Sequence, residues 1–287
     1  MSEIYLEYTN AAVPVISKLE PQTISYKENT CIETPNLFAR YFHFDKNDIL
    51  EDNLLEASSH VYYVVNGSGK TKISNSKTFV WKKGDVFIIP YTKTKVVHNS
   101  FMKDTILFTV DDSPLLRFLN ALPNKSRFSH VHYKNDTMLN EIARFSKEEG
   151  AKDRNRNGVL LTNPEMVKEN MNTLTHTMWS LMNMTPAKTI QKPHRHNSIA
   201  IDLCVDIDFK AEKKEQVYTL MSKEIDKDGN LINPVKIPWK KNCTFTTPPG
   251  WWHSHHNESN KPAWVFPVQD AGLHTYLRTL DIQFIQP

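Results

Sequence analysis

The sequence predicts an all-β fold in which two β-barrels or sandwiches are joined by a short helical insert. Short runs of β-branched and aromatic residues recur at close spacing, and turns that contain glycine or asparagine separate them. One motif occurs twice, at Trp81–Pro90 and again at Trp239–Pro248. A repeat spacing of about 158 residues is too long for a solenoid and indicates a duplicated domain.

The first barrel is predicted over residues 36–112, after an N-terminal arm at residues 1–35. Prolines interrupt the arm, so we expect at most a short strand or helix there. The clearest strand of the barrel is His60–Asn66, a β-branched and aromatic run that stops at a glycine-containing turn. Its other strands are expected at residues 37–44, 78–81, 85–90, 95–99 and 105–110.

A helical linker is predicted at residues 113–170. Ser113 and the proline that follows it favour the start of a helix, which Pro123 ends. A stripe of apolar residues at helical spacing predicts a second helix over residues 136–149. The polar segment 151–158 is expected to be a loop.

The second barrel is predicted over residues 171–287, where short strands resume. One of them is expected to begin at His194 and to continue through residues 199–207. The others are expected at residues 174–182, 216–221, 243–246, 263–268 and 281–285.

The composition is that of an ordinary globular protein, with 39% apolar residues and a formal charge of +3. The lysines are scattered, so neither nucleic acid nor a membrane surface is expected as a partner. Three cysteines without a CxxC pair fit a reducing interior. No signal-like start and no apolar stretch of about 20 residues occurs, so we expect a cytoplasmic location.

The most informative residues are two histidines, His194 and His196, at alternate positions of a predicted strand. Alternate side chains of a strand point to the same face, so the pair can clamp a metal ion. The run Pro248–Asn257 follows a tight Pro-Pro-Gly turn and offers a third histidine ligand. The sequence therefore predicts a three-histidine metal site, against the alternative of an exposed pair of strand histidines.

These segments resemble the two metal motifs of the cupin family. His194 and His196 match the start of the first motif, and Pro248, Gly250, His253 and Asn257 match the second motif Pro-x-Gly-x-x-His-x-x-x-Asn. The chain resembles a bicupin, a protein with two cupin barrels of the double-stranded β-helix or jelly-roll type. Residues from about 185 to 287 are similar to the metal-bearing cupin of gentisate 1,2-dioxygenases and their relatives that act on salicylate and hydroxynaphthoate.

This resemblance implies a non-haem Fe(II) dioxygenase with His194, His196 and His253 as metal ligands. Such an enzyme uses O₂ to cleave a small hydroxylated or amino-substituted aromatic compound. The same three ligands accept Zn, Mn, Ni or Cu, so the metal is not fixed by the sequence. Cupins often pair through their sheets, and we expect a homo-oligomer, either a dimer or a tetramer.

Two positions depart from the family patterns. Many cupins carry a glutamate ligand four or five residues after the second histidine, but Ala200 and Ile201 occupy those positions, as in the gentisate group. Asp202 stands where the gentisate group has an arginine for the substrate carboxylate. An acid there repels a carboxylate, so gentisate itself is not expected as the substrate. In a pocket Asp202 favours a cationic or hydrogen-bond-donating group, whereas the alternative is a solvated or salt-bridged aspartate.

Four side chains are candidates for roles beside the metal. Asp202 and His255 are the candidate catalytic groups, His255 because it shares the strand parity of His253 and can carry a proton. Trp252 and Trp264 are candidate walls for an aromatic substrate, together with Asp202, although tryptophan in a barrel is often core. His256 is expected to face the other way.

The first barrel lacks the clamp. His60 stands alone at the end of its first motif, and its second motif, Pro90–His98, has lost the glycine and the correctly spaced histidine. We therefore expect this barrel to be structural. Two rival functions stay open for the chain: a metal-dependent lyase or isomerase that does not use O₂, and a non-catalytic protein that binds a small molecule.

Overall fold

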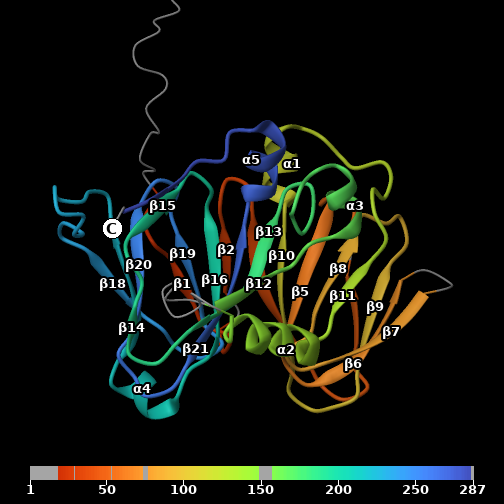
Figure 1. Cartoon of the computed structure of the whole chain (residues 1–287). Helices are drawn as coiled ribbons and strands as arrows, with labels where there is room; N and C mark the ends of the chain where they lie inside the picture. Colours follow the sequence, from red (N-terminus) through yellow and green to blue (C-terminus); the bar gives the residue numbers. More distant parts are fainter. Residues whose placement is uncertain (1–18, 29, 53, 74–76, 149–156, 286–287) are drawn as a thin grey trace, which may run out of the picture.

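The computed structural model describes residues 19–28, 30–52, 54–73, 77–148 and 157–285. Their strands form two antiparallel β-barrels that lie side by side, which confirms the predicted all-β class (Figure 1). Each barrel has two sheets, one facing the other barrel and one on the outside.

The first barrel contains the predicted strands and several more. Its inner sheet has the order β11 (Val131–Tyr133), β8 (Val86–Pro90), β5 (Ser59–Asn66), β10 (Thr105–Asp111), β3 (Phe38–Phe44) and β2 (Cys31–Glu33). Its outer sheet has the order β4 (Ile49–Asp52), β9 (Val96–Ser100), β6 (Ser68–Ile73) and β7 (Lys77–Lys82). The turn after β5 needs glycine, because Gly67 has φ 94° and a Cβ there would lie 2.3 Å from Thr105 Oγ1.

The second barrel repeats this arrangement. Its inner sheet has the order β1 (Thr23–Ile24), β19 (Thr244–Thr247), β16 (Ala200–Asp206), β21 (Ala263–Gln269), β13 (Trp179–Thr185) and β12 (Asn157–Leu160). Its outer sheet has the order β18 (Val235–Pro238), β17 (Val217–Ser222), β20 (Trp252–Asn257), β15 (His194–His196) and β22 (Ile282–Phe284), with β14 (Thr189–Ile190) also paired to β20.

One predicted strand is divided in two. The chain was expected to run as a single strand from His194 through residues 199–207, but β15 and β16 are separate strands in different sheets. The chain bends between them at Asn197-Ser198, where Asn197 N donates to Asp281 O at 3.1 Å. Residues on β16 therefore reach the barrel interior from the sheet opposite β15.

The insert and the N-terminal arm differ from a simple linker and tail. The insert contains α1 (Ser113–Phe118), α2 (Asn135–Phe145) and α3 (Pro164–Lys168), but it also supplies β11 and β12 to the two inner sheets. The described part of the arm places β1 against the second barrel and β2 against the first.

Residues 1–18 and the loop predicted at 151–158, except for its last two residues, lie outside the described residues. Both predicted helices are shorter than expected: Asn120 has φ 50°, which stops α1 before Pro123.

The largest apolar cluster lies between the barrels, whereas each barrel also has its own core. Tyr63 of the first barrel packs against Phe266 of the second with ring centroids 5.3 Å apart. Tyr41 donates a hydrogen bond to Asn242 O across the same interface at 2.7 Å. Successive residues of β5 and β16 alternate between this shared cluster and the core of their own barrel, so both faces of each inner sheet carry apolar residues.

Two short helices, α4 (Phe209–Lys213) and α5 (Ala271–Leu277), complete the second barrel. In the part of the chain that the structure describes, none of the helices has the length and apolar character needed to cross a membrane.

Candidate metal centre

Three histidines meet inside the second barrel. His194 and His196 come from β15 and His253 from the neighbouring β20, and one ligand atom from each lies within 4.8 Å of the others. The ring centroids of His194 and His253 are 4.1 Å apart, and those of His196 and His253 are 4.9 Å apart. All three side chains are buried. The predicted clamp and its third histidine are thus brought together by the fold.

Hydrogen bonds orient two of the imidazole rings for metal binding. His196 Nδ1 lies 2.8 Å from Ser198 O, and His253 Nδ1 lies 3.1 Å from Trp251 O. A carbonyl oxygen only accepts, so each Nδ1 carries the proton and donates it. Each Nε2 is then unprotonated, which is the form that binds a metal. The residues therefore fit a three-histidine ion site.

Backbone bonds join the two ligand segments. His194 lies opposite His253 in the pairing of β15 with β20. The turn that precedes β20 is tied to the clamp, because Gly250 N donates to His196 O at 2.7 Å. Gly250 has φ 78°, a left-handed conformation that glycine adopts without strain. The Pro-Pro-Gly sequence therefore sets the distance between the ligands as well as the start of the strand.

Comparison with solved structures agrees with this architecture. A variant of salicylate 1,2-dioxygenase from Pseudoaminobacter salicylatoxidans is 12% identical, with a TM-score of 0.72 over 99% of this chain and 94% of that one. The same enzyme in adducts with gentisate is 12% identical, with a TM-score of 0.69 over 96% of this chain and 88% of that one. A cupin 2 conserved barrel domain protein from Leptotrichia buccalis is 13% identical, with a TM-score of 0.50 over 88% of this chain and 91% of that one.

The protein has a bicupin fold. The match over nearly the whole length of both chains extends the resemblance from the second barrel to the pair of barrels. No family model matches the sequence, and no curated protein matches it.

His255 of the bicupin lies beside the three histidines and belongs to a chain of hydrogen bonds. Its ring centroid is 5.7 Å from that of His253 and 6.2 Å from that of His194. Trp239 Nε1 donates to Thr219 Oγ1 at 2.8 Å, and Thr219 Oγ1 lies 2.8 Å from His255 Nδ1. The hydroxyl accepts from the indole and shares a second hydrogen bond with His255 Nδ1, so this chain fixes the orientation of the imidazole ring.

Thr219 and Trp239 are site residues that the sequence reasoning did not single out. Trp239 begins the repeated motif, so the duplication itself was the signal that pointed to it. Phe284 is another: its ring stacks on His194 with centroids 5.6 Å apart, and its strand β22 pairs with β15. Nothing in the sequence around Phe284 indicates this contact, because the pairing partner lies about 90 residues away.

Asp202 lies on the inward face of β16, in the sheet opposite the histidines. It shares strand parity with Cys204, which belongs to the core of the second barrel, and it lies opposite Phe245 of that core. Thr247 Oγ1 donates to Asp202 Oδ2 at 2.9 Å. Burial raises the pKa of the Asp202 carboxyl to about 7, and this one hydrogen bond only partly offsets the effect. A solvated or salt-bridged aspartate is not what the structure contains.

The two tryptophans proposed as substrate walls lie elsewhere. Trp252 alternates with His253 along β20 and packs against Arg195, whose Cζ is 5.0 Å from the ring centroid. Trp264 packs against the apolar cluster between the barrels. Strand alternation explains both placements, because each ring is one residue out of phase with the inward positions.

The first barrel brings His60 and His98 near one ring without forming a comparable cluster. The Tyr62 ring lies between them, with centroids 6.2 Å from His60 and 5.0 Å from His98. Among the described residues, the three histidines of the second barrel are the group whose ligand atoms lie close enough together to hold a metal ion.

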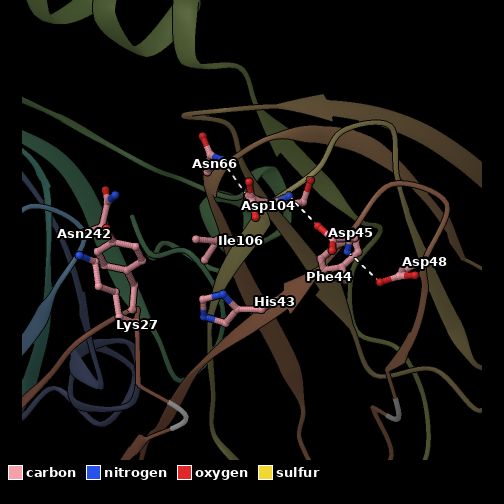
Figure 2. A pocket seen from close by; sticks show the side chains of 11 residues that line it. Lys27, His43, Phe44, Asp45, Asp48, Asn66, Asp104, Ile106 and Asn242 are labelled. Atoms are coloured by element: carbon pink, nitrogen blue, oxygen red, sulfur yellow. Dashed lines mark hydrogen bonds between the residues drawn. The ribbon is translucent and has the colours of Figure 1, made fainter.

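A cavity of about 700 Å³ lies between the first barrel, Lys27 of the N-terminal arm and Asn242 of the second barrel, and its lining contains none of the three histidines (Figure 2). Hydrogen bonds within its loops engage its acidic residues: Asp104 N donates to Asp45 Oδ1 at 2.9 Å, and Asp45 N donates to Asp48 Oδ2 at 2.8 Å. Asn66 Nδ2 donates to Asp104 O at 2.8 Å. These polar groups stabilise the loops that surround the cavity.

Proposed function

We propose that the protein is a non-haem Fe(II)-dependent dioxygenase that cleaves the ring of a small hydroxylated or amino-substituted aromatic compound. The observation that carries this proposal is the buried cluster of His194, His196 and His253 on a bicupin fold. The structural likeness to salicylate 1,2-dioxygenase supports it at the level of the scaffold.

The three histidines would hold the ion through neutral imidazole nitrogens. When bound, Fe(II) with three protein ligands supplies open positions for a bidentate substrate and O₂ on one face. The protein fixes two of those rings, because carbonyl oxygens accept the Nδ1 protons of His196 and His253 and leave Nε2 as the ligand atom.

Asp202 and His255 are the residues that we expect to act on the substrate. Asp202 faces the barrel interior from the opposite sheet, and with a pKa of about 7 it exchanges a proton readily near neutral pH. It would accept a hydrogen bond from an amino or hydroxyl substituent of the ring. His255, beside the three histidines, would donate a proton to a developing negative charge. Asp202 and His255 together favour a substrate that offers a hydrogen-bond donor over one that offers only carboxylates.

The test is metal analysis and O₂ uptake on protein purified without oxygen and loaded with Fe(II). Each protein would be assayed with a panel of hydroxylated and amino-substituted aromatic acids, including salicylate, gentisate and 2-aminobenzoate. We expect one Fe per chain, O₂ uptake with at least one panel member, and loss of both in His194→Ala.

The variant Asp202→Asn tests the expected substrate class separately from the ring-cleaving reaction. This variant keeps the metal ligands, so its iron content should equal that of the wild type while its KM for amino-substituted compounds rises. Full iron without O₂ uptake on any compound would contradict the dioxygenase, and absence of iron from the wild type would contradict the metal site.

A metal-dependent lyase or isomerase is the second candidate. The buried, nearly unpartnered carboxyl of Asp202 favours it, because a carboxylate with a pKa of about 7 is suited to proton abstraction. It predicts product formation under argon, which the dioxygenase does not allow.

A further inference from the structure

The inward face of the first barrel carries a group of buried polar side chains. Asp52, His60 and Asp111 are each at least nine-tenths buried. They share strand parity with core residues of that barrel: His60 with Tyr62 on β5, and Asp111 with Leu107 on β10. A barrel that served only as a scaffold would be expected to fill these positions with apolar side chains.

Four polar atoms on this face have no hydrogen-bond partner in the described structure. They are Arg40 Nε, His60 Nδ1, His98 Nε2 and Thr109 Oγ1. Buried polar groups in folded proteins are nearly always satisfied by protein or by a bound molecule. The four atoms therefore leave this inward face able to bond water or a polar ligand.

His98 presents its Nε2 to the interior. Trp81 Nε1 donates to Thr71 Oγ1 at 2.8 Å, and Thr71 Oγ1 lies 2.8 Å from His98 Nδ1. This chain fixes the orientation of the His98 ring and leaves Nε2 as its second polar atom. Burial lowers the pKa of His98 to about 4, so the ring is neutral at pH 7.

A cavity of about 500 Å³ reaches the buried polar group from the surface. Its lining includes the buried Asp52, His60 and Asp111 and the exposed Glu51 and Glu56. His60 Nδ1 is 4.0 Å from Asp52 Oδ2 and 3.9 Å from Asp111 Oδ2. Both distances are too long for a hydrogen bond but leave room for a donor that bonds to the ring nitrogen and a carboxylate together.

Acidic groups outnumber basic ones in the cavity lining. The carboxylates belong to Glu33, Glu51, Asp52, Glu56 and Asp111, and the guanidinium groups to Arg40 and Arg117. Both guanidinium groups are already paired, Arg117 with Glu33 at 2.6 Å and Arg40 with Asp52 at 3.5 Å. Glu51 is also paired, with Lys95 outside the lining. Glu56 and Asp111 therefore supply the excess negative charge of the lining, which favours a cation.

An aromatic wall of the cavity holds the Arg40 side chain in place. Phe38 and Phe42 line it, and the Arg40 guanidinium carbon lies 5.4 Å and 4.6 Å from their ring centroids. The guanidinium of Arg40 therefore occupies these ring faces, and its Nε has no hydrogen-bond partner in the described structure.

We propose that the first barrel binds a small ammonium compound that also carries a hydroxyl group, at a site separate from the three-histidine cluster. The ammonium group lies between Asp111 and His60 and donates to both. The hydroxyl group accepts from Arg40 Nε. This inference does not depend on the proposed dioxygenase function.

Three compounds of similar shape test whether the ligand must carry a positive charge. Tyramine carries an ammonium group, tyrosol carries a hydroxyl in its place, and 4-hydroxyphenylacetate carries a carboxylate. We expect tyramine to bind the wild type in a calorimetric titration and the other two to bind about 10- to 100-fold more weakly or not at all, because a charge-assisted hydrogen bond is lost. Asp111→Asn should weaken tyramine binding by a similar factor.

Matched variants locate the site. His194→Ala removes the metal cluster of the second barrel and should leave tyramine binding unchanged. Asp136→Asn removes one exposed carboxylate of α2, outside the cavity, and should also leave it unchanged. If Asp111→Asn does not fold, His60→Gln replaces it as the variant that should lose binding.

Equal binding of the three compounds would overturn the proposal, as would the absence of tyramine binding. Loss of tyramine binding in His194→Ala would assign the ligand to the second barrel instead. Each of these outcomes is independent of whether the second barrel consumes O₂.

Discussion

His98 and His255 occupy equivalent positions in the two barrels. Each Nδ1 lies 2.8 Å from a threonine hydroxyl that itself accepts from a tryptophan indole at 2.8 Å. The two sets are Trp81, Thr71 and His98 in the first barrel, and Trp239, Thr219 and His255 in the second. The duplication thus preserved a buried polar chain in both barrels, whereas the three-histidine cluster is found in one.

The equivalence predicts equal stability effects and unequal functional effects. Thr71→Val and Thr219→Val each leave an indole and an imidazole without their partner, so each should lower the free energy of unfolding by about 1–3 kcal/mol. Thr219→Val should also lower O₂ uptake, because it frees the ring beside His253. Urea denaturation and O₂ uptake on both variants check this, and an equal loss of uptake in Thr71→Val would contradict it.

His253 and His256 offer a matched pair on one strand. His253 faces the metal cluster, whereas His256 stacks on Tyr218 with centroids 4.7 Å apart. His253→Ala should lose the bound iron, and His256→Ala should retain it, because alternate residues of β20 face opposite sides. Metal analysis of the two purified variants measures the difference. Iron retained in His253→Ala would mean that another residue completes the site.

Asp202 makes stability depend on pH. Its folded-state pKa of about 7 lies above the ordinary value of 3.8, so the folded protein binds this proton more tightly than the unfolded chain. The contribution is fully present below about pH 4 and is lost as the pH rises to about 7, at about 1.4 kcal/mol per pH unit.

Asp202→Asn should remove that dependence, because an amide does not titrate in this range. The free energy of unfolding of the variant relative to the wild type should therefore increase from pH 4 to pH 7 and then stay constant. Urea titrations of the metal-free proteins at several pH values test it. Parallel curves for both proteins would show that Asp202 ionises normally.

The interface between the barrels should unfold together with them. Phe266→Ala removes a fully buried ring that contacts Tyr63 and leaves a cavity in the shared cluster, at a cost of about 3–5 kcal/mol. We expect a single transition at lower denaturant concentration, followed by circular dichroism and by tryptophan fluorescence. Leu277→Ala, at a half-exposed position of α5, is the control and should change stability little. Two separate transitions in the wild type would contradict a common core.

The sequence alone predicted the all-β class, most strands of both barrels and the three histidines that the fold brings together. These features depend on local rules: β-branched runs bounded by glycine turns, alternation along a strand, and a Pro-Pro-Gly turn before His253. The duplication was visible because Trp81 and Trp239 begin the same motif.

Only the tertiary structure decided which side chains meet across sheets. The break between β15 and β16 puts Asp202 opposite the histidines, and the pairing of β22 with β15 brings Phe284 onto His194. Trp252 and Trp264 turn away because strand register sets which residues face the barrel interior. Register and sheet order depend on contacts between segments distant in sequence, so no local pattern contains them. For the same reason, the isolated His60 did not predict the buried polar side chains that face the interior of the first barrel.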